Sequence, residues 1–376
     1  MTKIVLLDID GVLVSHGGYR AALHSTLNHY ASLMGLDHFD FHEEKLAELE
    51  KRGIFSEWDM VPLLLGTLWN DVLSHRPDLN LPADLSSAAV EIGCNVNGYI
   101  PRELHIPEFK LIAGQYPAES ALQHGCFPFI PLSLRTNLLS QSRNVNFSQT
   151  MRLFQHYTLG SRVFSQTYDL PAEVETESFL HTHDRSNIND EIRARLRQPH
   201  LHLVGLTARP SAPPKEISDS YIGYAPEAEI ALELVGLAGI PLMAFGKLEY
   251  LAAKYQLDPA TLMKPSPFQA LAATLAAWTG EEWSALQAAN HWRETGMLNE
   301  MFKRLPNTFE LIVVEDTMGG IRSTRKAGEI LKEAGFDLDV QAYGLTSGSA
   351  SKAEAFEQFD VPYFEDWSAL INGIEL

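Results

Sequence analysis

The sequence predicts an α/β protein whose core is a doubly wound parallel sheet. Several short aliphatic runs have the length and composition of strands that are buried on both faces. Helical patterns separate the later runs, and proline or glycine stands near the ends of these patterns. Strands that alternate with helices along the chain are typical of this fold class.

The expected elements follow one another in the order that a Rossmann-like core requires. The expected strands are Ile4–Leu7, His202–Leu206, Pro241–Phe245, Leu311–Val314 and Val340–Leu345. Between the later strands we expect helices at about Pro226–Ala238, Pro267–Ala277 and Gly319–Ala334. Pro226 suits the first turn of its helix, and Gly239 and Gly335 suit the positions just beyond helix ends.

The first strand is followed by a long region without a comparable strand. Residues 16–198 show helical or irregular patterns, with helices expected at Tyr19–Met34, Phe41–Arg52, Ser56–His75, Ser148–Leu159 and Asn189–Arg197. The stretch Cys94–Asn146 is rich in Pro, Gly and Asn and has no assignment. We therefore expect a large, mainly helical cap domain (16–198) inserted after the first strand of a discontinuous core (1–15 and 199–376). A smaller Trp-rich insertion is expected at about Trp278–Asn307.

Composition narrows the classes of partner. Of the 376 residues, 48 are acidic and 29 basic, so the basic face of a nucleic-acid-binding protein is not expected. No apolar stretch reaches the roughly 18 residues of a membrane span, and no signal peptide is expected at the start. The two cysteines form no CxxC pair, which favours a reduced, cytoplasmic setting. No pattern predicts an oligomeric state.

Polar residues follow the expected strands where the strands end. Asp8 and Asp10 stand two apart, so on an extended chain their carboxylates share one face. The later strand ends and the loops after them carry Thr207, Lys264, Glu315 and Asp316. In open α/β sheets the ligand crevice lies beyond the carboxyl ends of the strands, so these side chains should meet. Acids this close favour a shared cation or proton.

These segments, in this order, resemble the four motifs of the haloacid dehalogenase-like (HAD) phosphohydrolases. LLDIDGVL matches the family's strand followed by DxD, and VGLTARP its strand that ends in Thr or Ser. LMKPSP matches the lysine motif, and VVEDTMGG the acidic motif in the form found in β-phosphoglucomutase-like members. The resemblance covers residues 1–15 and 199–376. The middle of the chain is similar only in being a helical cap inserted after the first motif (C1-type).

The resemblance implies an Mg²⁺-dependent phosphatase that hydrolyses a small phosphorylated metabolite through an aspartyl-phosphate intermediate. It makes Asp8 the nucleophile and a metal ligand, and Asp10 the general acid and base and a ligand through its carbonyl. It assigns further metal binding to Glu315 and Asp316. It assigns phosphoryl binding to Thr207, the amide of Ala208, and Lys264.

Three further residues are candidates for substrate contact, and two other functions stay open. Tyr19 and Arg20 open the first expected cap helix, and Arg209 lies two residues after Thr207. The same motifs would serve a phosphomutase of the β-phosphoglucomutase type, or a non-catalytic protein that binds a phosphorylated ligand on the same fold. The cap is longer than the compact caps of that group, so the family pattern does not extend to the substrate.

Overall fold

The chain forms two compact units in the computed structural model, which describes residues 2–36, 40–96, 104–217 and 222–374. The sheet unit consists of Met1–His16 and Asp184–Leu376, and the helical unit of Gly17–His183. The second boundary therefore lies earlier than the predicted boundary after Gln198. The reason is that the segment from Asp184 onward pairs and packs with the sheet unit, as described below.

The central sheet is parallel throughout. Among the described residues it has six strands in the order β5-β4-β1-β6-β7-β8, which confirms the doubly wound, Rossmann-like core. Their bounds are β1 Lys3–Leu7, β4 Leu201–Leu206, β5 Leu242–Met243, β6 Thr308–Glu315, β7 Asp337–Leu345 and β8 Tyr363–Phe364. The five predicted strands are all present. The edge strand β8 has two residues, too few to give a pattern in the sequence.

The central position of β1 explains why its sequence is aliphatic without alternation. Ile4 and Leu6 belong to the hydrophobic core on one face of the sheet, and Val5 and Leu7 to the core on the other. Successive side chains of a strand point to opposite faces, so both faces must be apolar. Because β4 and β6 flank β1, polar residues beyond its end lie between two further strand ends.

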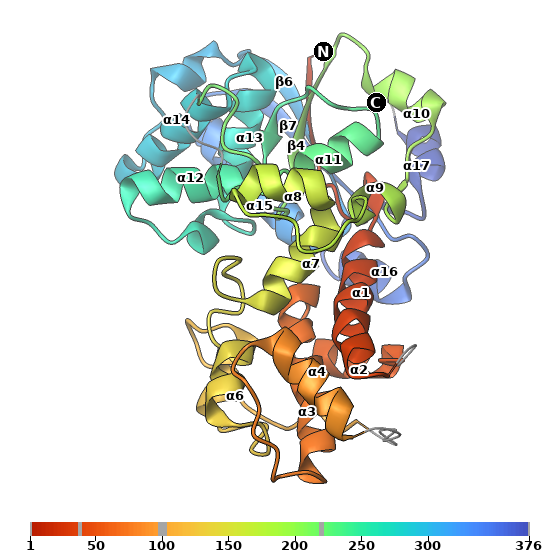
Figure 1. The fold of residues 1–376 in the computed structure, drawn as a ribbon. Helices are drawn as coiled ribbons and strands as arrows, with labels where there is room; N and C mark the ends of the chain where they lie inside the picture. Colours follow the sequence, from red (N-terminus) through yellow and green to blue (C-terminus); the bar gives the residue numbers. More distant parts are fainter. Residues whose placement is uncertain (1, 37–39, 97–103, 218–221, 375–376) are drawn as a thin grey trace. The chain divides into compact units, whose positions relative to one another are not determined.

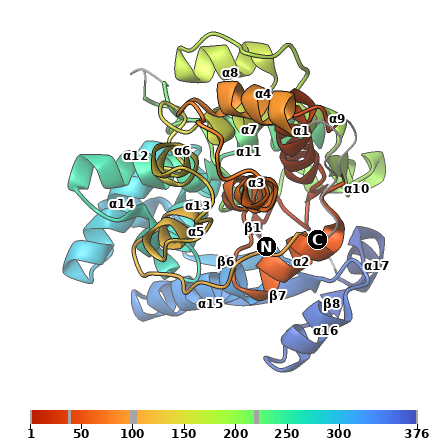
Figure 2. The same ribbon diagram turned by 60° about the horizontal axis from the view of Figure 1, so that its bottom comes forward.

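Helices cover both faces of this sheet (Figure 1). One core includes residues of α12 (Phe245–Tyr255), α13 (Pro267–Thr279), α14 (Glu282–Thr295), α15 (Met318–Glu333) and α16 (Ala350–Glu357). The other includes residues of α10 (Asp190–Leu196), α11 (Glu227–Leu234) and α17 (Trp367–Gly373). The Trp-rich segment forms α14, which packs on α13, and the 3₁₀ turn Glu300–Arg304; a second 3₁₀ turn spans Pro259–Leu262. Figure 2 shows α17 beside the edge strand β8.

A short antiparallel ribbon joins the two segments of the sheet unit. It consists of β2 (Val14–Ser15) and β3 (Arg185–Ser186), and the Ser15 hydroxyl donates to the side-chain oxygen of Asn187 (2.6 Å). Helix α10, which follows, places Ile192 and Leu196 in the core of the sheet unit. These contacts are why the sheet unit begins again at Asp184.

The helical unit is built from helices alone, among its described residues. They are α1 (Gly18–Leu33), α2 (Glu43–Lys51), α3 (Glu57–Ser74), α4 (Leu85–Asn95), α5 (Pro117–Gln123), α6 (Leu132–Leu139), α7 (Gln149–Leu159), α8 (Ser161–Tyr168) and α9 (Phe179–Thr182). Helix α3 is buried over most of its length, and α1 packs on α3 and α7. The previously unassigned stretch contains α5 and α6, while residues 97–103 lie outside the described residues. No described helix combines the length and the hydropathy needed to span a membrane.

Candidate active site

Asp8 follows the end of β1, and both its backbone and its side chain are held by hydrogen bonds. Its N–H donates to the Val314 carbonyl of β6 (3.1 Å), and its Oδ1 accepts from the Ile9 N–H (2.8 Å). The loop that follows is held by Trp367 of α17, whose indole N–H donates to the Val12 carbonyl (2.8 Å). Asp8 is only 5% exposed. Its carboxylate is therefore a buried, pre-oriented group.

Lys264 connects Asp8 to the end of β6. Its Nζ lies 2.9 Å from Asp8 Oδ2 and 2.6 Å from Glu315 Oε1, and it donates to the Leu206 carbonyl at 3.3 Å. The ammonium thus brings together residues from the ends of β1, β4 and β6. The predicted meeting of Asp8, Lys264 and Glu315 is present in the structure.

Three carboxylates gather beside this ammonium. Oxygens of Asp8, Glu315 and Asp316 all lie within 4.8 Å of one another, a spacing that could hold a metal ion. Glu315 is also bound through Oε2, which accepts from the backbone N–H (3.2 Å) and the hydroxyl (3.0 Å) of Thr317. Asp316 Oδ2 accepts from Lys352 Nζ of α16 at 2.6 Å. The sequence motifs did not include Lys352, although it too follows the end of a strand, β7.

Two glycines make room for these acids. Gly11 has φ +73°, and a Cβ there would lie 2.2 Å from Asp316 Oδ2. A Cβ on Gly320, in the first turn of α15, would lie 1.9 Å from Glu315 Oε1. Backbone and carboxylate can approach so closely only because neither glycine has a side chain. The glycine that follows the DxD pair is therefore required by both conformation and space.

The acids carry more negative charge than the lysine compensates. Burial, and then the charge of Glu315, raise the pKa of Asp8 well above its usual range, while Lys264 opposes the rise. Burial alone would lower the pKa of Lys264, but the charges of Asp8 and Glu315 outweigh it and raise that pKa. Burial also raises the pKa of Asp316, against its ion pair with Lys352. One ammonium is shared by two carboxylates, which is a setting that favours a cation.

Gln269 ties the loop after β4 to the lysine. Its buried side chain donates to the carbonyls of Thr207 and Met243 (both 2.9 Å) and accepts from the Lys264 N–H (3.0 Å). Thr207 follows β4 directly, and its N–H also donates to the Met243 carbonyl (3.1 Å). Ala208, the next residue, is exposed. No sequence pattern singled out Gln269, because a polar residue inside an apolar helix has many structural uses.

Asp10 forms its ion pair with Arg209. Arg209 Nε lies 2.9 and 2.8 Å from the two Asp10 carboxylate oxygens, and Nη2 lies 2.6 Å from Oδ1. The same Nη2 donates to Asp184 Oδ2 at 2.9 Å. Burial alone would raise the pKa of Asp10, but the charge and hydrogen bonds of Arg209 outweigh it and lower that pKa. Arg209 is buried and bound by two acids, and its predicted contact with substrate stays a prediction.

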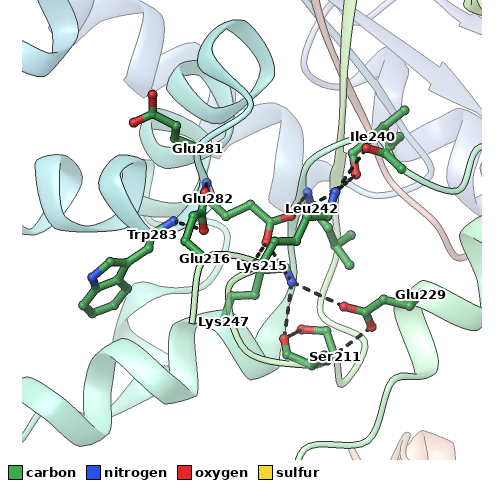
Figure 3. A network of polar contacts seen from close by, with 12 residues as sticks. Ser211, Lys215, Glu216, Glu229, Ile240, Leu242, Lys247, Glu281, Glu282 and Trp283 are labelled. Carbon is green, nitrogen blue, oxygen red and sulfur yellow. Dashed lines mark hydrogen bonds and ion pairs between the residues drawn. The ribbon is translucent and has the colours of Figure 1, made fainter. Parts of the chain in front are cut away.

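The loop that carries Thr207 and Arg209 is anchored by a buried ionic network (Figure 3). Lys247 of α12, 1% exposed, has Nζ 3.3 Å from Glu229 Oε1 and 3.1 Å from Glu282 Oε2, and donates to two loop carbonyls. Glu282 accepts from the backbone N–H groups of Lys215 in the loop and Leu242 in β5 (both 2.9 Å). Charged side chains from α11, α12 and α14 thus hold the backbone beyond β4.

The two remaining candidates, Tyr19 and Arg20, begin α1 of the helical unit. Tyr19 is buried against the rings of Trp58 and Phe154. Arg20 Nη2 pairs with Glu50 at 2.8 Å, and its Nε lies 4.0 Å from carboxylate oxygens of both Glu43 and Glu57. These contacts join α1 to α2 and α3. A role in substrate binding stays a prediction for both residues.

Two cavities of the sheet unit bear on the location of a site. One of about 670 Å³, walled by Trp292, Phe302 and Phe336, lies at the C-terminal end of α15, opposite the acids. Its size suits a ligand, but the titratable groups described above are all elsewhere. A second, of about 330 Å³, is lined by Gly11 and Ser347 among others, and so borders the loop that follows Asp10. We therefore place the candidate site at the carboxyl ends of the strands.

Comparisons with known proteins support the fold alone. No family model matches the sequence, and no curated protein matches it. The chain is similar to a crystal structure determined as a target of the Northeast Structural Genomics Consortium, with a TM-score of 0.68 and 18% sequence identity. The alignment covers 99% of this chain and 98% of that one. At this identity the likeness concerns the arrangement of the elements.

Proposed function

We propose that the protein is an Mg²⁺-dependent phosphatase of the HAD type, acting on a small phosphorylated metabolite in the cytoplasm. The observation that carries the proposal is the contact of Lys264 with Asp8 (2.9 Å) and Glu315 (2.6 Å) beside the carboxylate of Asp316. A solvated lysine or a helix-capping acid would not be buried among the ends of three strands. A carboxylate that attacks a phosphate dianion needs positive charge beside it, and Lys264 supplies part of that charge within the buried site.

The donor set suits a hard divalent cation. Asp8, Glu315 and Asp316 offer carboxylate oxygens, the ligands that Mg²⁺ prefers, and the Asp10 carbonyl is a further candidate. Three carboxylates face the two ammonium groups of Lys264 and Lys352, which leaves one negative charge. A bound Mg²⁺ would supply charge neutralisation for the phosphoryl group and the acids around it.

In the proposed reaction the chain's own residues act in two steps. Asp8 attacks phosphorus, so that its carboxylate oxygen gains the phosphoryl group and the alcohol oxygen leaves. Lys264 holds Asp8 in place and balances charge. The Thr207 hydroxyl, which accepts from the Arg209 N–H (3.2 Å), would donate its own proton to a phosphoryl oxygen. Water then releases inorganic phosphate from Asp8.

Asp10 is the group proposed to move protons in both steps. Its bidentate contact with Arg209 favours the ionised carboxylate, the form that accepts a proton from the attacking water. Proton donation to a leaving alcohol requires the protonated form, which the same contact opposes. The structure therefore supports the role of Asp10 in hydrolysis of the intermediate more directly than its role in forming it.

The first experiment compares wild type with Asp8→Asn in a phosphate-release screen over a broad panel of phosphorylated metabolites, with and without Mg²⁺. The amide is nearly isosteric with the carboxylate but a poor nucleophile, so we expect turnover to be lost, by at least about 10³-fold, while the fold remains. Asp190→Asn, a change at an exposed residue of α10, is the matched control. Retained turnover in Asp8→Asn would refute the nucleophile assignment.

The same screen separates a phosphatase from a phosphomutase. A phosphatase releases phosphate from its substrate without a bisphosphate activator.

A further inference from the structure

Arg209 is an unusual residue to find buried beside a candidate site. Its side chain is 2% exposed, and its guanidinium bridges Asp10 and the fully buried carboxylate of Asp184. Its backbone is fixed as well: its N–H donates to Thr207 Oγ1 (3.2 Å), and its carbonyl accepts from the Phe245 N–H (3.0 Å). Arginine in such a fork holds a carboxylate in one orientation, which a lysine could not do.

Stability alone does not explain this arrangement. Taking Arg209 and Asp184 out of water is costly, and a well-packed apolar set of the same volume is often as stable or more stable, while the side chain of Asp10 keeps 33% of its exposure. What the ionic set does provide is a defined orientation for the carboxylate of Asp10. Within the described residues, Oδ1 accepts from both Nε and Nη2 of Arg209, whereas Oδ2 accepts from Nε. Oδ2 therefore keeps acceptor capacity for a further donor such as water.

We propose that Arg209, held by Asp184, is a positioning residue that orients Asp10 for hydrolysis of the aspartyl phosphate. The inference rests on the proposed phosphatase function. In this step the water oxygen bonds to phosphorus and the bond between phosphorus and Asp8 breaks. The proton of water passes to Asp10, and the products are inorganic phosphate and the free Asp8 carboxylate. Asp184, which no motif includes, acts through Arg209 and touches neither water nor phosphorus.

The test measures formation and decay of the intermediate separately in the full chain. Wild type, Arg209→Gln, Arg209→Lys and Asp184→Asn are mixed with Mg²⁺ and ³²P-labelled p-nitrophenyl phosphate, then chased with unlabelled ester and quenched in acid. The nitrophenolate leaves without needing a proton, so formation of the labelled protein does not depend on proton donation by Asp10. Asp190→Asn, in an exposed pair with Arg193, is the matched control.

We expect decay of the labelled protein to slow on the order of 10²-fold in Arg209→Gln, with formation close to wild type, because general-base catalysis contributes about that much. Asp184→Asn should also slow decay, but less, and Arg209→Lys, which keeps the charge but loses the fork, should decay almost as slowly as Arg209→Gln. Both kcat and KM should fall together, because the intermediate accumulates. Near-isosteric Asp184→Asn keeps the test valid if Arg209→Gln does not fold.

Three outcomes would overturn the inference: two of them point to a structural role, and the third contradicts the proposed function itself. If wild type forms labelled protein and the variants lose formation and decay equally, Arg209 and Asp184 have a structural role only. Unchanged decay in folded variants has the same meaning. If wild type with Mg²⁺ neither takes up label nor releases phosphate, the proposed function itself is wrong, and the positioning role falls with it.

Discussion

At the scale of single residues, Gly11 shows how tightly the acid cluster is assembled. Its φ of +73° disfavours any side chain, and a Cβ would overlap Asp316 Oδ2. We expect Gly11→Ala to lower the free energy of unfolding by at least about 1 kcal/mol and to displace Asp316. The measurement is the unfolding temperature as a function of Mg²⁺ concentration. Gly11→Ala should need a higher Mg²⁺ concentration than wild type to reach half of the total rise in unfolding temperature.

Gly280→Ala is the matched control for that experiment. Gly280 has φ +76°, but a Cβ there would meet no atom within 4 Å. Gly280→Ala forces an alanine into a positive φ but causes no overlap with another atom. It should therefore lower the free energy of unfolding and leave the response to Mg²⁺ unchanged. An equal shift in both variants, or none in either, would show that contact between Gly11 and Asp316 does not govern metal binding.

A second residue, His156 of the helical unit, predicts a dependence of stability on pH. It is fully buried and stacks on Phe164 (3.6 Å between ring centroids); Nε2 accepts from the Glu173 N–H (2.9 Å), and Nδ1 lies 2.8 Å from the Arg152 carbonyl. The ring is therefore neutral, with its proton on Nδ1. Burial lowers the pKa of His156 below its ordinary value, against the smaller opposing effect of the Arg152 carbonyl.

Whether stability rises or falls with pH depends on which state of the protein, folded or unfolded, binds the proton more tightly. Below about pH 6.5 the unfolded histidine binds a proton that the folded one does not, so stability present at neutral pH is lost as pH falls toward the lower folded pKa. The slope from one such group is at most about 1.4 kcal/mol per pH unit. Urea titrations at pH 5, 6 and 7 give the free energy of unfolding at each pH. This free energy should change less with pH in His156→Gln than in wild type, because glutamine is neutral and can make both hydrogen bonds. Equal slopes would contradict the assignment.

The sequence predicted that Asp8, Lys264 and Glu315 meet, but it did not predict which residues hold the candidate site in place. Asp8, Lys264 and Glu315 meet as predicted because parallel strands end at one edge of the sheet. Asp184 is far from these residues in the sequence, and Gln269 lies within the apolar helix α13. Nothing in their own neighbourhood marks them, and only the tertiary structure shows their hydrogen bonds.

At the scale of elements, the network around Lys247 fixes α12 and α14 to the loop beyond β4 (Figure 3). We expect Lys247→Met to lower the free energy of unfolding by about 3–5 kcal/mol, because it leaves the buried carboxylate of Glu282 poorly compensated. Thermal or urea unfolding measures the loss. Phosphate-ester turnover should fall too, since Thr207 and Arg209 depend on that loop.

Lys254→Met, the same change at an exposed position of α12, should cost no more than about 1 kcal/mol, the size of its contact with the Tyr250 ring. The double variant Lys247→Met/Glu282→Gln should recover part of the loss, because the uncompensated charge is gone. A small effect of Lys247→Met, or no recovery in the double variant, would mean that the network does not act through charge.

Elements of clear periodicity were predictable, and short ones were not. The buried strands and the helices α13 and α15 carry strong apolar patterns that proline or glycine delimits. The ribbon strands β2 and β3 have two residues each, and they pair only because the chain returns after the whole helical unit. The helical unit therefore ends at His183, before the predicted bound at residue 198, because the return segment from Asp184 looks helical and polar in sequence.

At the scale of the whole molecule, the helical unit can be removed from the chain and the sheet unit tested without it. In the helical unit, a Cβ on Gly17 would lie 2.6 Å from the His183 carbonyl oxygen, so its two ends are adjacent. In the sheet unit, Ser15 pairs with Arg185 in the antiparallel ribbon. Residues 17–183 can therefore be replaced by two glycines between His16 and Asp184, which closes the ribbon as a hairpin with a four-residue loop.

We expect the shortened chain to fold, because both cores of the sheet unit lie within it, and to keep Mg²⁺-dependent turnover of p-nitrophenyl phosphate. The proposed catalytic groups all belong to the sheet unit and would recognise only a phosphoryl group and a metal. We predict that discrimination among leaving groups comes from the helical unit, so that the spread of kcat/KM over a metabolite panel narrows sharply in the shortened chain. Asp8→Asn in the shortened chain controls for contaminating activity. A folded but inactive product would show that the helical unit supplies a catalytic group, and an unchanged ranking of metabolites would show that it does not select the substrate.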